Sequence, residues 1–177
     1  KEAKRIVDDH RVKYNGQGER AFVTHSLDMA FWYDAICSLE PKVFLVDLPP
    51  VRNLLTQLKV DGYRIGAITD GPTKQAEKIL STIGVDKNIF SLFIGWELGM
   101  PLPKGGSKNV YQKVLSEYAL LPKEVMMVGD SLGSDILPAS EVGLRVVHIG
   151  THGHSVFPTL KSVAQLSDYL KKITNEN

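Results

Sequence analysis

The sequence predicts an α/β fold: a Rossmann-like, three-layer structure in which helices cover both faces of a parallel sheet. From about Arg64 onward, short apolar runs alternate with segments whose apolar residues recur at helical spacing, which is the order expected of parallel strands joined by crossover helices. The chain has 177 residues, of which 43% are hydrophobic and 23% are charged, so it can bury the core of one such domain.

The predicted helices are amphipathic segments, three of which end at a glycine, and the predicted strands are short apolar runs. Gly62, Gly84 and Gly143 supply helix stops, and Ser107 is a candidate N-cap. Three glycines and two prolines make residues 98–106 a predicted loop. In chain order we expect a helix at 51–61, a strand at 64–69, a helix at 73–83, a strand at 91–96, a helix after Ser107, a strand at 125–128, a short helix at 135–142, a strand at 145–149 and a closing helix at 165–173.

The first forty residues lack this alternation, and we expect two helical pieces there, separated by a polar break at 15–18. His25, Trp32 and Tyr33 lie in this part of the chain and could face a substrate. Aromatic side chains at this spacing more often pack against a core, and we favour that interpretation.

Charge and cysteine content exclude several classes of function. The chain carries 21 basic and 20 acidic side chains, so no long-range field selects nucleic acid or an anionic membrane. The single cysteine, Cys37, cannot form an intramolecular disulfide, and no apolar stretch approaches the roughly 20 residues that span a bilayer. We therefore expect a cytoplasmic protein without nucleic-acid or membrane partners. The chain begins at Lys1 and not at methionine, so the sequence leaves open whether a further segment precedes it.

Polar residues lie at the ends of three of the predicted strands or in the connections that follow those strands. They are Thr69 with Asp70 and Gly71, then Lys104, and then Asp130 followed by Asp135. Strand ends of an open parallel sheet are where ligands bind. A hydroxyl with adjacent backbone N–H groups can hold phosphate oxygens, an ammonium can neutralise them, and carboxylates suit Mg²⁺. Together these residues predict a phosphate and metal site, although each group alone is typical of turns or solvated loops.

At these residues the chain resembles the haloacid dehalogenase superfamily of phosphatases, in the branch with a small helical cap. Residues 65–71 and 125–136 look like that family's second and fourth motifs. The resemblance implies that Thr69, with Asp70 and Gly71, binds the phosphoryl group. By the same likeness Asp130 ligates Mg²⁺, and Asp135 is either a further acid near the metal or the partner that orients the motif lysine.

The lysine of the family's third motif has two candidates. Lys104, in a Pro-Lys-Gly-Gly turn, fits the pattern loosely, and Lys108 is the weaker rival. Histidines near the last strand, His148, His152 and His154, could also touch a metal or substrate, but ordinary loop roles are favoured because metal-binding histidines need further ligands and a fixed geometry.

The family's first motif, a buried strand ending in Asp-x-Asp, is absent from this chain. The nearest imitation is the run 43–47, which ends in Asp47, and the favoured interpretation is a connection from cap to core. In that family this first strand lies in the middle of the sheet, between the strands that would end here at Thr69 and Asp130. If it were missing, those two strands would keep buried backbone N–H and C=O groups without partners, each at a cost of about 1–3 kcal/mol in stability. We therefore hypothesise that residues 1–40 are the remnant of a cap and that 41–177 form a core lacking its first strand, which an upstream segment supplies.

The expected function is that of a Mg²⁺-dependent phosphatase acting on a small phosphate monoester. The resemblance implies an aspartyl-phosphate intermediate on a nucleophile upstream of Lys1. The alternative is a non-catalytic binding or interaction module that has lost the nucleophile. A nucleotide-binding Rossmann domain is less favoured, because no Gly-x-Gly-x-x-Gly motif follows a strand. The sequence specifies neither the ester nor the oligomeric state.

Overall fold

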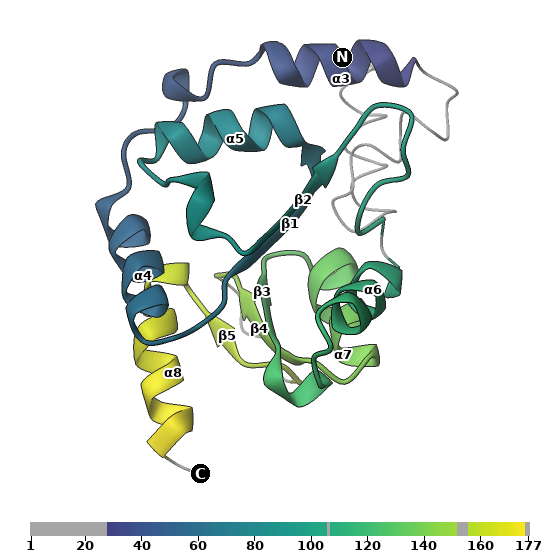
Figure 1. The fold of residues 1–177 in the computed structure, drawn as a ribbon. Helices are drawn as coiled ribbons and strands as arrows, with labels where there is room; N and C mark the ends of the chain where they lie inside the picture. Colours follow the sequence, from purple (N-terminus) through teal and green to yellow (C-terminus); the bar gives the residue numbers. More distant parts are fainter. Residues whose placement is uncertain (1–27, 106, 152–155, 176–177) are drawn as a thin grey trace.

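The computed structural model describes residues 28–105, 107–151 and 156–175, and it has the expected α/β architecture (Figure 1). Its strands are all parallel and form two sheets. The first sheet pairs β1 (Gly66–Pro72) with β2 (Leu92–Trp96). The second has the order β3-β4-β5, from β3 (Met126–Gly129), β4 (Arg145–Ile149) and β5 (Thr159–Leu160).

Helices lie on both sides of these strands, as a three-layer fold requires (Figure 1). In β3, Met126 and Val128 pack against the cluster formed with α4 and α8, whereas the intervening Met127 packs against the cluster built on α6 and α7. This alternation follows from the two-residue period of a strand. The described helices are α3 (Met29–Ser38), α4 (Pro49–Val60), α5 (Thr73–Thr82), α6 (Asn109–Glu117), α7 (Leu137–Glu141) and α8 (Leu166–Asn175).

In the part of the chain that the structure describes, the two sheets are not hydrogen-bonded to each other. Ile68 of β1 pairs with Ile94, and Val128 of β3 pairs with Val147, so each of these two strands has one partner within the described residues. Direct pairing of β1 with β3 would have contradicted a missing central strand, and it does not occur. The edges of β1 and β3 that have no partner in the described residues therefore retain N–H and C=O groups that a further strand could pair.

Helices hold the two sheets in one framework despite this break. Val110 and Tyr111 of α6 share a core cluster with Ile68 and Ile94 of the first sheet and with Met127 of the second. On the other side, Leu54 and Leu58 of α4 lie in a cluster that includes Ile65, just before β1, and residues of β3 and α8. Burial of apolar side chains on both faces therefore replaces the missing backbone pairing.

Several element boundaries differ from the sequence prediction. β1 continues through Asp70 and Gly71 to Pro72, with an irregular register after Ile68, where a loop was predicted. The two-residue strand β5 was not predicted, because so short a run has no visible period. A π-helical turn at Leu132–Ile136 precedes α7, so the short helix predicted at 135–142 is shorter and begins later.

The cap of α6 also differs by one residue. The helix begins at Asn109, with Lys108 in the N-cap position, while the hydroxyl of Ser107 accepts a hydrogen bond from the Asn109 N–H (3.2 Å). Ser107 therefore still satisfies one of the free N–H groups at the start of the helix.

Trp32 and Tyr33 pack, as favoured from the sequence, whereas Phe31 beside them is 70% exposed. Trp32 and Tyr33 of α3 contact Trp96 at the end of β2, with ring centroids 5.4 and 5.2 Å apart. The Tyr33 hydroxyl also donates to Glu97 (3.4 Å), and Cys37 is buried. The predictions for His25 and for most of residues 1–40 fall outside the described residues.

The run 43–47 is not a strand. A 3-10 turn at Pro41–Val43 leads into irregular chain, and Val43 and Phe44 are about 70% exposed. Asp47 forms an ion pair with Arg52 (2.8 Å) and lies beside Gly84, beyond the C-terminal end of α5. Because Thr73, at the start of α5, follows β1 directly, Asp47 lies at the opposite end of that helix from the candidate site residues.

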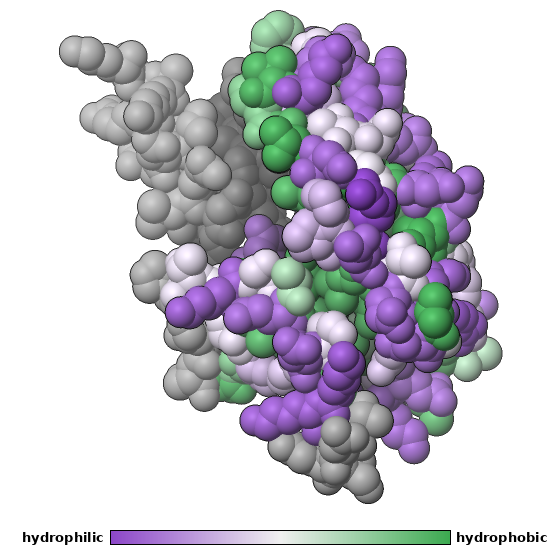
Figure 2. Space-filling model, turned by 90° about the vertical axis from the view of Figure 1, so that its left-hand side faces the viewer, coloured by the Kyte–Doolittle hydropathy of each residue, from purple (hydrophilic) through white to green (hydrophobic). Residues whose placement is uncertain are grey.

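The surface is mainly polar on the face drawn in Figure 2, with apolar residues in separate patches. In the part of the chain that the structure describes, no helix has both the length and the apolar character needed to cross a membrane.

Replacing Ile136 by alanine is expected to lower the free energy of unfolding by about 2–5 kcal/mol, because its side chain is fully buried next to Asp135. Urea unfolding measures this loss. Val60→Ala is the control: Val60 is 75% exposed, and its replacement should change stability by no more than about 0.5 kcal/mol. Equal effects of the two substitutions would contradict the assigned core.

Candidate active site

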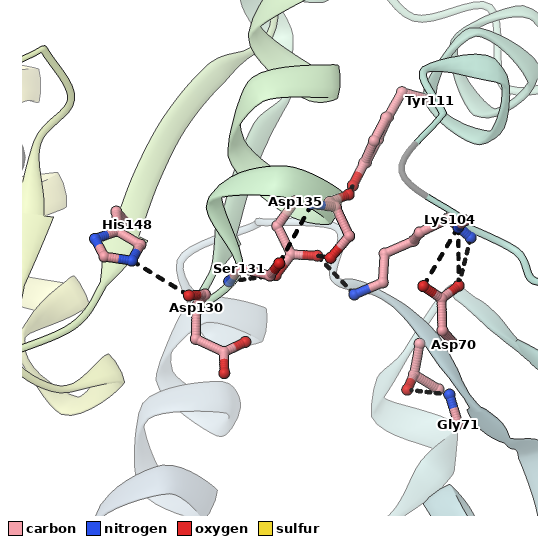
Figure 3. Close-up of polar contacts among 11 residues, drawn as sticks. Asp70, Gly71, Lys104, Tyr111, Asp130, Ser131, Asp135 and His148 are labelled. Atoms are coloured by element: carbon pink, nitrogen blue, oxygen red, sulfur yellow. Dashed lines mark hydrogen bonds and ion pairs between the residues drawn. The ribbon is translucent and has the colours of Figure 1, made fainter. Parts of the chain in front are cut away.

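A buried ion pair joins two of the three predicted groups (Figure 3). The ammonium of Lys104 lies 2.6 Å from Oδ1 of Asp135, and the two side chains are 13% and 3% exposed. Lys104 comes from the loop after β2, and Asp135 from the turn after β3, so this contact connects the two sheets at their C-terminal ends. Removing one partner of such a pair leaves an uncompensated buried charge, at about 3–5 kcal/mol.

The Asp135 carboxylate is also held from its own side. Its Oδ2 accepts a hydrogen bond from the Ser131 N–H (3.0 Å), so the loop after β3 wraps around it. Gly129 makes this approach possible, because a Cβ at that position would lie 2.6 Å from Cγ of Asp135. The glycine that precedes Asp130 and Ser131 is thus required by the packing of the Asp135 carboxylate.

Asp130 has a different environment. Its carboxylate is exposed and extends away from Asp135 (Figure 3). The backbone carbonyl of Asp130 lies 3.2 Å from Nε2 of His148, a buried residue of β4. This contact anchors the main chain at Asp130 and leaves the carboxylate available for a ligand.

Thr69 and Gly71 form a local turn at the end of β1. The Gly71 N–H donates to the Thr69 hydroxyl oxygen (3.0 Å), which leaves the hydroxyl proton able to donate to an anion. The Gly71 N–H predicted to hold phosphate therefore has an internal acceptor in this structure.

Asp70, predicted beside them as a phosphate-binding residue, instead directs its carboxylate to the loop of Lys104. Oδ1 accepts from the Lys104 N–H (2.6 Å), and both oxygens lie 3.3 Å from the Gly105 N–H. Lys104 is therefore in contact with the β1 end through its backbone and with the β3 end through its ammonium (Figure 3). The three predicted groups thus meet in one region.

The remaining candidates lie elsewhere or outside the described residues. Lys108 projects from the start of α6, is half-exposed, and lies 4.0 Å from Glu141 on α7, so Lys104 is the lysine at this site. His148 contacts Asp130 only through the backbone carbonyl. His152 and His154 fall outside the described residues.

Tyr111, in the helix that was predicted after Ser107, lies next to the candidate site and was not singled out from the sequence. Its hydroxyl donates to the carbonyl of Ser134 (2.8 Å), next to Asp135. Burial raises the pKa of this hydroxyl above its usual value, and the carboxylates of Asp135 and Asp70 raise it further. The sequence analysis also did not predict the contact between His148 and the backbone carbonyl of Asp130. Neither interaction has a local sequence signal, because the partners are 23 and 18 residues apart.

The donor set fits a magnesium ion only in part. Within the described residues, no cluster of three or more His, Cys, Asp or Glu side chains could hold a metal. Asp135 is engaged by Lys104 and Ser131, which leaves the Asp130 carboxylate as the available acid. One or two carboxylates with several waters are a usual protein environment for Mg²⁺, so Asp130 is compatible with such a site.

Comparison with known proteins identifies relatives of the chain. Residues 6–143 match a family model described as haloacid dehalogenase-like hydrolase. The chain is 34% identical over 141 residues to the glyceraldehyde 3-phosphate phosphatase of Pyrococcus abyssi, covering 76% of this chain and 58% of that protein. It is 33% identical over 126 residues to the phosphoglycolate phosphatase of Pasteurella multocida, covering 71% and 52%. The chain thus spans little more than half the length of these curated relatives.

Solved structures show the same fold. A HAD phosphatase from Thermococcus onnurineus superposes with a TM-score of 0.66 at 22% identity, covering 94% of this chain and 78% of that chain. A predicted phosphoglycolate phosphatase from Haemophilus somnus gives a TM-score of 0.60 at 23% identity, with 94% and 75% covered. At this level of identity the likeness concerns the fold alone.

Gly129→Ala is expected to displace Asp135, because the added Cβ would overlap its side chain, and to lower the free energy of unfolding by about 1–3 kcal/mol. Gly66→Ala is the matched control in β1, since its Cβ would meet Leu92 at an ordinary distance of 3.5 Å. Denaturant unfolding of both variants measures the difference. A loss no larger for Gly129→Ala than for Gly66→Ala would contradict the close approach.

Tyr111→Phe is expected to cost about 0.5–1.5 kcal/mol at neutral pH, because the Ser134 carbonyl loses its donor. The pKa of this hydroxyl is higher in the folded protein than its value of about 10 in the unfolded chain. The neutral hydroxyl therefore contributes its full stabilisation at pH values below about 10, and this contribution is lost as the pH rises from there toward the folded pKa. The stability difference between wild type and variant should therefore narrow above about pH 10. Thermal unfolding between pH 7 and 11 measures this; a constant difference would contradict it.

Proposed function

The chain belongs to the haloacid dehalogenase-like hydrolase family, and we propose that it forms the phosphate-binding and metal-binding part of a Mg²⁺-dependent phosphatase acting on a small phosphate monoester. The observation that carries the proposal is the buried pair of Lys104 and Asp135, which holds an ammonium between the C-terminal ends of β1 and β3. An ammonium in this position can neutralise a phosphoryl group bound at the ends of both strands.

Each residue has a role that follows from its contacts. The Thr69 hydroxyl donates to a phosphate oxygen, and Lys104 balances the negative charge. Asp130, with an exposed carboxylate and an anchored main chain, holds Mg²⁺. Of the two roles open for Asp135, its contacts favour the orientation of Lys104, because its oxygens are taken up by the ammonium and by the Ser131 N–H. When bound, Mg²⁺ would supply further stabilisation of the charge on the phosphoryl oxygens.

The nucleophile is proposed to come from a segment outside these 177 residues. A parallel strand inserted between β1 and β3 would pair their open edges and bring its own C-terminal end next to Thr69 and Asp130. An aspartate there would attack phosphorus and form an aspartyl-phosphate, with a proton passed to the departing alcohol from a neighbouring acid. Water would then hydrolyse the acyl phosphate to release inorganic phosphate and restore the carboxylate.

Substrates for a first assay follow from the relatives. Glyceraldehyde 3-phosphate and phosphoglycolate, which appear in the names of two relatives, are both short phosphate esters, and we propose a substrate of that size. The alternative is a non-catalytic module of the same fold, which the lack of an Asp-x-Asp motif in the chain favours. An encoded Asp-x-Asp ahead of Lys1 would support the enzyme, and its absence would support the module.

In the protein that includes the completing segment, Asp130→Asn is expected to remove Mg²⁺-dependent phosphate release, because the substitution neutralises the available acid at the metal position. Asp86→Asn is the control: the Asp86 carboxylate is exposed and accepts from the Asn88 N–H within its own turn, in the connection between α5 and β2. Initial rates of phosphate release at varied Mg²⁺ concentration measure the effect. Turnover that survives in Asp130→Asn at wild-type level would contradict the metal role.

A further inference from the structure

Asp70 makes long-range hydrogen bonds to the backbone of the loop that carries Lys104. Its carboxylate accepts from the N–H groups of Lys104 and Gly105, residues 34 and 35 positions later in the chain. The shortest of these contacts, 2.6 Å to the Lys104 N–H, is charge-assisted, and such hydrogen bonds contribute about 1.5–3 kcal/mol. Asp70 therefore ties this loop to the end of β1.

The loop needs such a tie because it has little regular structure of its own. Between the end of β2 and the start of α6, its other contacts include a Trp96 indole N–H to the Met100 carbonyl (2.7 Å) and a Ser107 N–H to the Lys104 carbonyl (2.7 Å). Leu98 and Met100 in the same loop are 46% and 63% exposed, so apolar burial holds this part weakly.

Lys104 is thereby held at both of its ends. A lysine side chain loses up to about 2 kcal/mol of conformational entropy when it is fixed, so an ammonium is placed reproducibly only if both its backbone and its head group are constrained. Asp135 constrains the head group and Asp70 constrains the backbone (Figure 3). The two carboxylates come from the end of β1 and from the turn that follows β3, the strands that flank the break between the sheets.

We propose that Asp70 is a positioning residue whose carboxylate fixes the main chain at Lys104, and that this carboxylate is not a ligand of the phosphate. The inference rests on the proposed function for its catalytic consequence only. A carboxylate facing a phosphate would repel it, whereas the Asp70 carboxylate is directed to two backbone N–H groups that offset its charge.

Amide hydrogen exchange tests the positioning directly. In Asp70→Ala, the Lys104 amide should exchange about tenfold faster or more than in wild type, because its charge-assisted hydrogen bond is lost. Amides of β2 and β3 report whether the fold is intact. Asp70→Asn keeps one carbonyl acceptor and should exchange at an intermediate rate, and it keeps the test decisive if the alanine variant does not fold. Asp86→Ala, which removes a carboxylate bound within its own turn, should leave the Lys104 amide unchanged.

Phosphatase kinetics of the complete protein separate positioning from binding. If Asp70 acts through Lys104, Asp70→Ala should lower kcat by about 100-fold when Lys104 is present, and should lower it no further in a Lys104→Ala background. If Asp70 contacted phosphate directly, the two substitutions would instead lower kcat independently, and their fold losses would multiply in the double variant.

An unchanged exchange rate of the Lys104 amide, or multiplying kinetic losses, would overturn the positioning role. Absence of phosphate release from the wild-type protein would overturn the proposed function alone. The exchange rates would then still decide whether Asp70 holds the loop.

Discussion

The contact between Lys104 and Asp135 is the constraint on which the arrangement of the site depends. Its two residues belong to segments that follow different sheets, and no backbone hydrogen bond joins those sheets in the described residues. Because both side chains are largely buried, separating them would leave two charges without compensation in a poorly solvated place. The pair therefore sets the distance between the strand ends as well as the position of the ammonium.

The break between β1 and β3 explains why so many polar contacts gather at one end of the fold. Elsewhere along these strands, apolar residues of α4 and α6 bridge the two sheets on opposite faces. At the C-terminal ends this role passes to Asp70 and Asp135, both of which bind Lys104. The same polar network thus connects the ends of the two sheets. Under the proposed function it also places an ammonium beside the phosphate.

Sequence reasoning succeeded where the signal was local. The run 145–149 was predicted as a strand with the observed bounds, and the helices between strands were found within a few residues, because apolar period and glycine stops lie in short windows. It failed for β5, which is too short to show a period, and for the continuation of β1 through Asp70, where Asp-Gly-Pro is typical of a turn. Pairing with β2 at Trp96 overrides that local preference.

The order of residues along the chain was enough to assign the fold class and to propose Thr69, Lys104, Asp130 and Asp135 as candidate site residues, because strand periodicity and strand-end chemistry are written in neighbouring positions. The order of residues was not enough to predict which of these side chains contact one another. That Lys104 and not Lys108 meets Asp135, that Asp70 holds a loop, and that Tyr111 and His148 support the turns around the acids all depend on contacts between residues 18 to 35 positions apart. Such contacts arise from packing of helices and sheets, which brings distant segments together and which no short stretch of sequence encodes.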